Sequence, residues 1–248
     1  MYNKSTKKKV IHAIIIVIIF FAILSAIGLY ILRYQVKGES NLPFNITKII
    51  IAQSVEGTEK ENQPERWNLL VSENNDIYIY LEKNSKYNKT EIIESIDINN
   101  IIINKNNTKG EANCYRPIKD ENTMFNNLEE NKITQITYTG DLESNIKEQK
   151  ISNQGGIVAF RYGINNLANY ISNDAQEIDY SKLLQLTNIS EEDIKTAISF
   201  DIIINLTTGK KYQSNINIDI PAKEVIEKGT NGIEITDLSN LVFKRIDN

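Results

Sequence analysis

The longest apolar run of the chain lies near its N-terminus. From Ala13 to Leu32, twenty residues follow one another without a charged side chain. At about 1.5 Å of rise per residue, a helix of this length spans about 30 Å, the thickness of the hydrocarbon core of a bilayer. A helix satisfies its own backbone hydrogen bonds in lipid, so the run predicts a transmembrane helix despite its many β-branched residues.

The charged residues on either side of this run predict its orientation. Four lysines and no acid precede it: Lys4, Lys7, Lys8 and Lys9. This excess of lysine predicts that residues 1–12 form a basic tail in the cytoplasm and that the rest of the chain is exported, first through a stalk at residues 33–44. A cleaved signal peptide is the alternative, but its apolar core usually covers about 7–15 residues and ends at a small-residue cleavage site. Here the stretch Leu24-Ser25-Ala26 lies inside the apolar run instead of after it.

Beyond residue 45, apolar and polar residues alternate with the period of two that is typical of β-strands. The clearest case is a pair of alternating runs, residues 198–206 and 212–220, around a turn at residues 208–210. These runs predict a long hairpin with one dry face and one wet face. Further strands are expected at residues 46–54, 132–139, 157–164, 233–235 and 241–246, and at 92–104 either as two strands or as one strand with a bulge.

Residues 66–83 read as a second hairpin, because two β-rich runs flank the polar sequence from Glu73 to Asp76. In its second run Tyr78 and Tyr80 share one face. Tyrosines in this pattern are typical of cross-strand packing, and a carbohydrate-stacking surface is the alternative.

Short helices are expected at four places outside the membrane segment. Residues 120–131 place Met124 and Leu128 four apart on one predicted buried face, and residues 180–186 form a second candidate. Ser190, followed three residues later by Asp193, has the pattern of a capping box at a helix N-terminus. Residues 222–228 follow Pro221 and are closed by Gly229.

Together these elements predict a mainly β protein. An N-terminal transmembrane helix is followed, over residues 45–248, by an antiparallel β-sandwich-like extracytoplasmic domain with two or three short helices. The domain forms either one large lobe or two small ones. For two lobes, the charged loop at residues 140–155 is the expected seam.

Net charge and cysteine content narrow the possible partners. Residues 1–37 contain six basic and no acidic residues, which leaves 22 basic and 32 acidic residues beyond them, a net charge of −10. This acidic domain argues against nucleic-acid binding and against a domain that lies flat on anionic lipid. Cys114 is the single cysteine, so the chain cannot form an internal disulfide. We expect a partly buried thiol without a functional role, with a cross-link between two chains or a reactive thiol as alternatives.

The sequence lacks the residues that most catalytic and metal sites require. His12, the single histidine, lies at the cytoplasmic end of the apolar run, which excludes histidine-based catalysis or metal binding outside the membrane. No phosphate loop, dinucleotide fingerprint or zinc spacing occurs, so we expect no cofactor, no metal and no catalytic residues. Carboxylate chemistry remains open. Its candidates, which lack the spacing of a calcium loop, are Glu56, Asp76, Asp97, Asp120, Asp141 and Asp201.

The predicted membrane helix also carries small residues. Ala22 and Ala26 are four apart, a spacing that allows two helices to approach closely and so allows a homodimer. The expected partners are therefore the membrane itself, through Ala13 to Leu32, other envelope proteins, and a second copy of the chain.

One resemblance adds to this picture. The lysine cluster, the apolar run, the sequence Asn41-Leu42-Pro43-Phe44-Asn45-Ile46 and the later Asn75-Asp76-Ile77-Tyr78-Ile79-Tyr80 resemble uncharacterised single-pass envelope proteins of low-G+C Gram-positive bacteria. The resemblance covers about the first third of the chain and implies no activity, ligand or site.

Three functions remain compatible with the sequence. The first is a membrane-anchored extracytoplasmic binding or scaffolding protein of the cell envelope without catalytic activity. The second is a subunit of a membrane secretion or spore-envelope assembly, in which the helix does more than anchor the chain. The third is a carboxylate-dependent cell-wall hydrolase, which requires two converging acids about 5–10 Å apart.

Overall fold

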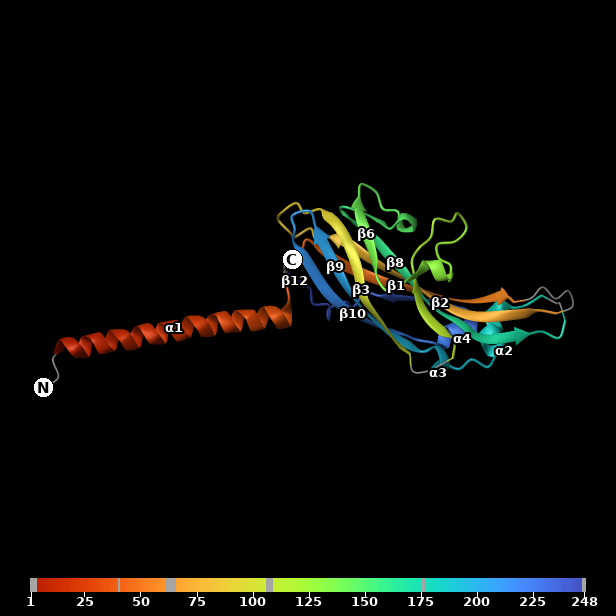
Figure 1. Cartoon of the computed structure of the whole chain (residues 1–248), viewed down its shortest axis with the longest axis horizontal. Helices are drawn as coiled ribbons and strands as arrows, with labels where there is room; N and C mark the ends of the chain where they lie inside the picture. Colours follow the sequence, from red (N-terminus) through yellow and green to blue (C-terminus); the bar gives the residue numbers. More distant parts are fainter. Residues whose placement is uncertain (1–3, 40, 61–65, 106–108, 175–176, 247–248) are drawn as a thin grey trace.

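The computed structural model describes residues 4–39, 41–60, 66–105, 109–174 and 177–246 (Figure 1). The chain begins with one long helix, α1 (Lys4–Lys37), which projects away from a β-rich body (Figure 1). Within it, residues 14–31 are long and apolar enough to cross a membrane, and all of them are exposed in the structure. The apolar run is therefore helical, as predicted, and residues 14–31 contribute nothing to the core of the body.

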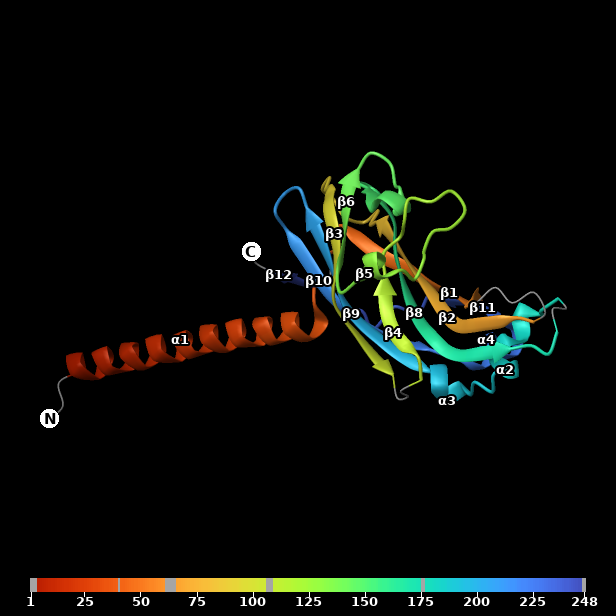
Figure 2. The same cartoon turned by 45° about the vertical axis from the view of Figure 1, so that its right-hand side comes forward.

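The body consists of two six-stranded sheets, seen from a second direction in Figure 2. Sheet A has the strand order β11-β1-β2-β8-β4-β5, and all its neighbours are antiparallel. Its strands are β1 (Phe44–Glu59), β2 (Asn68–Lys83), β4 (Glu111–Tyr115), β5 (Lys132–Ile133), β8 (Gly155–Ile171) and β11 (Thr230–Ile235).

Sheet B has the order β12-β10-β9-β3-β6-β7. Its strands are β3 (Ile93–Lys105), β6 (Ile136–Asp141), β7 (Lys150–Ser152), β9 (Thr196–Leu206), β10 (Lys211–Ile220) and β12 (Lys244–Ile246). The short pair β6–β7 is parallel, so this sheet is mixed instead of purely antiparallel. The prediction of a mainly β body behind an apolar N-terminal helix is confirmed.

Both sheets contribute to one cluster of buried apolar side chains. Phe160 of β8 and Phe200 of β9 are fully buried and meet edge to face, with 5.3 Å between the ring centroids. Tyr138 of β6 joins the sheets in a second way, because its hydroxyl donates to the carbonyl of Ala159 (2.6 Å) and accepts from the Ala159 N–H (3.1 Å). The tyrosine hydroxyl thus satisfies backbone groups of sheet A from sheet B.

Several predicted elements are confirmed at residue level. The alternating runs form the antiparallel pair β9–β10, in which Ile216 lies opposite Phe200 and Ile218 opposite Ile198. The helix expected after Ser190 is α3 (Glu191–Ile194), and the one expected before Gly229 is α4 (Lys223–Lys228). The remaining short helices of the described residues are η1 (Glu129–Asn131), η2 (Ile146–Glu148), η3 (Tyr180–Lys182) and α2 (Leu183–Leu186).

Two strand predictions are wrong because strands continue through polar sequence. Residues 66–83 do not form a hairpin: β2 is one strand of 16 residues that runs through Glu73 and Asn75 and pairs with β1 and β8 along its length. Likewise β8 does not end with the strand predicted at residues 157–164 but continues through Asn165 and Asn166 as far as Ile171. By contrast, residues 92–104 form one strand with an irregularity near Asn100, which is one of the two expected alternatives.

The helix expected at residues 120–131 is also wrong. The Asp120 carboxylate accepts hydrogen bonds from the backbone N–H groups of Asn122 and Thr123, but no helix follows this contact, because residues 121–128 form only bends and irregular chain. Only the last three residues form the single turn η1. Leu128 is exposed, and Phe125 is the apolar residue of this segment that is buried.

The connection between α1 and the body is short, and described residues on both sides of position 40 are hydrogen-bonded to the body. The helix extends to Lys37, into the first residues of the predicted stalk, and β1 begins at Phe44. The Glu39 N–H donates to the carbonyl of Phe243 (2.7 Å), and the Asn84 side chain donates to the carbonyl of Leu42 (2.7 Å). Each sheet takes strands from both sides of residues 140–155, so these residues do not separate the two sheets.

Replacement of Gly38 is expected to loosen this connection. Gly38 has φ +68°, and a Cβ added to it would lie 2.4 Å from the Phe243 carbonyl oxygen. We expect Gly38→Ala to cost about 1–2 kcal/mol for the left-handed backbone and more for the displaced segment. Gly209→Ala is the matched control, since φ is +79° but no atom lies within 4 Å of the added Cβ. Proteolysis of the connection and urea unfolding should both be affected more by the first substitution; equal effects would contradict a tightly packed connection.

Candidate functional site

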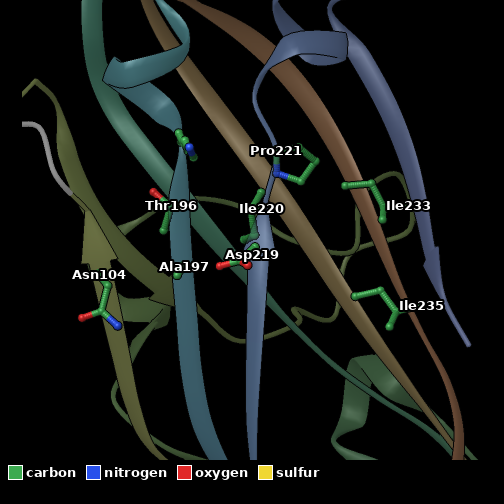
Figure 3. A pocket seen from close by; sticks show the side chains of 9 residues that line it. Asn104, Thr196, Ala197, Asp219, Ile220, Pro221, Ile233 and Ile235 are labelled. Atoms are coloured by element: carbon green, nitrogen blue, oxygen red, sulfur yellow. The ribbon is translucent and has the colours of Figure 1, made fainter. Parts of the chain in front are cut away.

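One candidate site is a groove of about 720 Å³ where β11 of sheet A faces the ends of β9 and β10 of sheet B (Figure 3). Its lining residues are Asn104, Lys195, Thr196, Ala197, Asp219, Ile220, Pro221, Ile233 and Ile235. Figure 3 shows Ile233 and Ile235 projecting from β11 toward the side on which Ile220 and Pro221 lie. The groove therefore has apolar walls contributed by the edges of both sheets.

The two isoleucines of β11 line the groove because of their register. Ile233 pairs with Ile51 and Ile235 pairs with Ile49, and both β1 residues are buried in the core. Residues directly opposite each other on neighbouring strands face the same side of a sheet. Ile233 and Ile235 thus face inward, yet they remain partly exposed because β11 is the last strand of sheet A.

A buried amide holds the Pro221 side of the groove. Gln53 of β1 is 3 % exposed, and its Nε2 donates to the Pro221 carbonyl (3.1 Å) and to Asn75 Oδ1 (2.9 Å). Its Oε1 accepts from Asn231 Nδ2 of β11 (2.8 Å). Asn75 Nδ2 in turn donates to Glu73 (2.8 Å). This network joins the end of β10 to β1, β2 and β11, and so fixes the width of the groove.

Helix α3 positions the opposite end of the groove, because the chain passes from it directly into Lys195 and Thr196. Asp193 closes the capping box by accepting from the Ser190 N–H (2.8 Å) and hydroxyl (2.7 Å), and it pairs with Lys109 (2.9 Å). The Thr196 hydroxyl lies 3.0 Å from that of Tyr162. These buried polar contacts therefore hold the backbone of Lys195 and Thr196 in place at this end of the groove.

The pKa of Asp193 predicts how this rim responds to acid. Burial alone would raise the pKa, but the hydrogen bonds from Lys109 and Ser190 outweigh burial and lower it from 3.8 to about 2. A lowered pKa in the folded state stabilises the fold above the unfolded value, and this contribution is lost as the pH falls from about 4 to about 2. We expect Asp193→Asn to cost on the order of 1–2 kcal/mol near neutral pH and little at pH about 2.

The measurement is urea unfolding of the full chain in detergent at several pH values. Glu192→Gln is the matched control, since it removes an exposed carboxylate from the same helix. A stability difference for Asp193→Asn that stays constant down to the lowest pH would contradict the assigned contacts.

The groove offers little acid–base chemistry. Asp219 is the one carboxylate among its described lining residues, together with the ammonium of Lys195 and the amide of Asn104 at the exposed rim. A pair of carboxylates, as glycoside hydrolysis requires, is not assembled there. Apolar walls with a mixed polar rim instead suit the binding of an extended or apolar segment.

The structure brings together two of the six acids considered from sequence. Glu56 and Asp76 both approach Arg161, whose Nε and Nη2 donate to Asp76 at 2.6 and 3.1 Å and whose Nη1 lies 3.6 Å from Glu56. The other four acids have separate partners. Asp97 accepts from Thr137 and Asn205, Asp120 from backbone N–H groups, Asp141 pairs with Lys150, and Asp201 accepts from Asn100 and Asn215.

Both tyrosines of the possible carbohydrate surface are partly buried and contact other side chains. The Tyr78 hydroxyl lies 3.8 Å from the sulfur of Met124, and burial raises the pKa of Tyr78 to about 12. The Lys48 ammonium lies 4.6 Å from the centroid of the Tyr80 ring. The contacts of Tyr78 and Tyr80 are thus those of packed structural side chains.

Cys114 is a buried free thiol, 4 % exposed, and burial raises its pKa to about 12. Within the described ranges, no group of three His, Cys, Asp or Glu side chains is arranged to hold a metal ion. Ala22 and Ala26 are exposed on α1. Homodimer formation therefore stays a prediction.

The groove itself was not predicted from the sequence. Ile233 and Ile235 were assigned to a strand, but their position at the end of a sheet depends on pairing with β1, nearly 180 residues away.

Comparison of the chain with protein-family models, curated proteins and solved structures found no match.

Proposed function

We propose that the chain is a membrane-anchored extracytoplasmic binding protein of the cell envelope, which holds an extended segment of another envelope protein in the groove beside β11. The observation that carries this proposal is the combination of an apolar groove with the free edge of β11. Among the described strands, none pairs with that edge. Catalysis is not part of the proposal, because the groove lining supplies a single carboxylate.

The free edge of β11 and the groove suit the same ligand. An added strand would pair its backbone with the exposed N–H and C=O groups of β11, and its alternate side chains would enter the space between β11 and Pro221. Ile233 and Ile235 lie two residues apart, which is the spacing of side chains on one face of a strand. An extended peptide with alternating apolar residues is therefore the expected ligand.

The anchor and the layered body complete the proposal. We place residues 14–31 of α1 across the membrane, with the lysines before them in the cytoplasm and the two sheets, as the layers of a sandwich, outside the cell. Alkaline carbonate extraction should leave the full chain in the membrane fraction, and a C-terminal tag should be accessible from outside. A mature form that lacks its first thirty or so residues would instead identify a cleaved signal.

A subunit of a membrane secretion or spore-envelope assembly is the main alternative. In that role α1 itself makes specific contacts, for instance through Ala22 and Ala26. Exchange of residues 13–32 for an unrelated spanning helix would then abolish function, whereas the groove proposal expects function to survive the exchange.

Site-specific photo-crosslinking tests the groove directly. A photoreactive residue at position 235 in the full chain should yield a discrete adduct in intact cells, and the adduct should disappear when Ile233→Asp is added. The matched control is a photoreactive residue at position 171, since Ile171 is 51 % exposed at the far end of β8. Adducts of equal yield and identity from both positions, or an adduct that persists with Ile233→Asp, would contradict the proposal.

A further inference from the structure

The end of the β-rich body beside α1 differs in charge from the rest of it. Four segments form this end. The first, residues 38–44, connects the helix to β1, and the second, residues 82–91, begins at the β2 positions that pair with Phe44 and Asn45. The third, residues 207–213, contains the β9–β10 turn, and the fourth, residues 241–246, includes β12. Figures 1 and 2 show the β9–β10 turn and β12 at the side of the body from which α1 projects. We call these segments the proximal end.

Hydrogen bonds and one ion pair hold the four segments together. The Asn84 N–H donates to the Pro43 carbonyl (2.8 Å), and the Glu39 N–H donates to the Phe243 carbonyl (2.7 Å). Lys210 pairs with Glu91 and also approaches the Tyr87 hydroxyl (3.4 Å). The proximal end is therefore one surface with a fixed relation to the last turn of α1.

Basic residues dominate this surface. The proximal end contains seven of them and three acids, whereas the remainder of residues 38–248 contains 15 basic and 29 acidic residues. The seven are Lys83, Lys86, Lys89, Lys210, Lys211, Lys244 and Arg245. Three further acids border these segments in the sequence, Glu94, Asp237 and Asp247, and basic residues stay in excess when they are included.

The length of α1 places this surface just outside the layer of lipid headgroups. Residues 32–37 continue the helix beyond the apolar window, which adds about 9 Å at about 1.5 Å per residue. The headgroup layer on each side of a bilayer is only about 5–8 Å thick. With residues 14–31 in the hydrocarbon core, the short connection therefore leaves the proximal end facing the membrane surface.

We propose that the proximal end binds the anionic phospholipid headgroups of the membrane that α1 spans, an inference that rests on the proposed membrane anchor. The positive end is attracted to the anionic surface, and the acidic remainder of the body is repelled by it. The body is then oriented with its proximal end against the membrane surface. In this orientation β11 and its groove are directed away from the bilayer and stay accessible to other envelope proteins.

The test uses the full chain reconstituted in vesicles of phosphatidylcholine alone or of phosphatidylcholine mixed with phosphatidylglycerol. Lysine modification by an amine reagent is followed residue by residue with mass spectrometry. We expect Lys86, Lys89 and Lys244 to react several-fold more slowly in the anionic vesicles and to regain their reactivity at high salt. Lys182 and Lys223, which are exposed elsewhere on the body, are internal controls and should react equally in both vesicles.

Charge-removing variants separate lipid contact from other causes of protection. The variant Lys86→Gln, Lys89→Gln should reduce the protection of Lys244 in anionic vesicles, while urea unfolding in detergent confirms that it folds. Lys182→Gln, Lys223→Gln is the matched control and should leave that protection unchanged. Equal modification rates in both kinds of vesicle would overturn the inference.

Flotation of the same vesicles distinguishes the two proposals. A chain that floats with both vesicles but shows no lipid-dependent protection refutes headgroup binding alone. A chain that floats with neither vesicle refutes the membrane anchor, and the inference with it.

Discussion

Asp76→Ala is expected to destabilise the protein by about 3–5 kcal/mol, because it leaves a buried guanidinium without its main partner. The Arg161 side chain is 7 % exposed, and Asp76 accepts from both its Nε and its Nη2. The neighbouring contacts are weaker substitutes: Asn127 Oδ1 lies 3.3 Å from Nη1, and Glu56, which is half exposed, lies 3.6 Å away. Urea unfolding of the full chain in detergent, followed by the fluorescence of Trp67, measures the loss.

Two further variants show whether the loss of stability comes from the buried, unpaired charge of Arg161. Glu234→Ala breaks the exposed contact with Lys48 at 4.0 Å, and we expect a cost of about 1 kcal/mol or less. The double variant Asp76→Ala, Arg161→Met removes both charges and should be more stable than Asp76→Ala alone. A loss for Asp76→Ala no larger than that for Glu234→Ala would show that the pair is not desolvated as the structure places it.

The hairpin β9–β10 was predictable because the residue pattern within each strand shows which side chains face the core. The apolar side chains of residues 198–206 and 212–220 alternate strictly, and one buried face fixes the pairing of two such strands. The same reasoning predicts the inner face of β8, where Val158, Phe160 and Tyr162 are all buried. Period-two patterning therefore identifies strands well wherever one face is dry and the other is wet.

The same reasoning fails for β2, where polar residues enter the core. Glu73 and Asn75 are buried at 1 % and 0 % exposure, and both take part in the network around Gln53. In isolation a run from Glu73 to Asp76 indicates a turn, because such residues are expensive to bury without partners. Their partners come from other strands, which no local pattern reveals.

The candidate groove shows a further limit of sequence reasoning. Its lining comes from segments around residues 104, 195–197, 219–221 and 233–235, which meet only after both sheets have formed. Each lining side chain is ordinary for its own element, so no local motif marks the site. The charge asymmetry of the proximal end is similar: its basic residues are dispersed over about 160 positions of the sequence and gather through strand pairing.

Phe200→Ala is expected to cost about 3–5 kcal/mol and to shift the unfolding of both sheets together. Phe200 belongs to sheet B and is fully buried, and its ring meets that of Phe160 in sheet A at an interplanar angle of 85°. Loss of this ring leaves a cavity between the sheets and removes an aromatic contact. Because both sheets share the cavity walls, one cooperative transition should move to lower urea.

Two probes decide whether the body unfolds as one unit or as two. Trp67 immediately precedes β2 of sheet A and reports on that sheet, whereas far-ultraviolet circular dichroism reports on all strands. In a single unit, Phe200→Ala moves both curves by the same amount, and Ile102→Ala, at an exposed position of β3, moves neither by more than about 0.5 kcal/mol. In two independent lobes, the Trp67 transition would stay at its original urea concentration while the dichroism curve divided into two steps. Such a result would support two small lobes instead of one large lobe, because sheet A would then fold without sheet B.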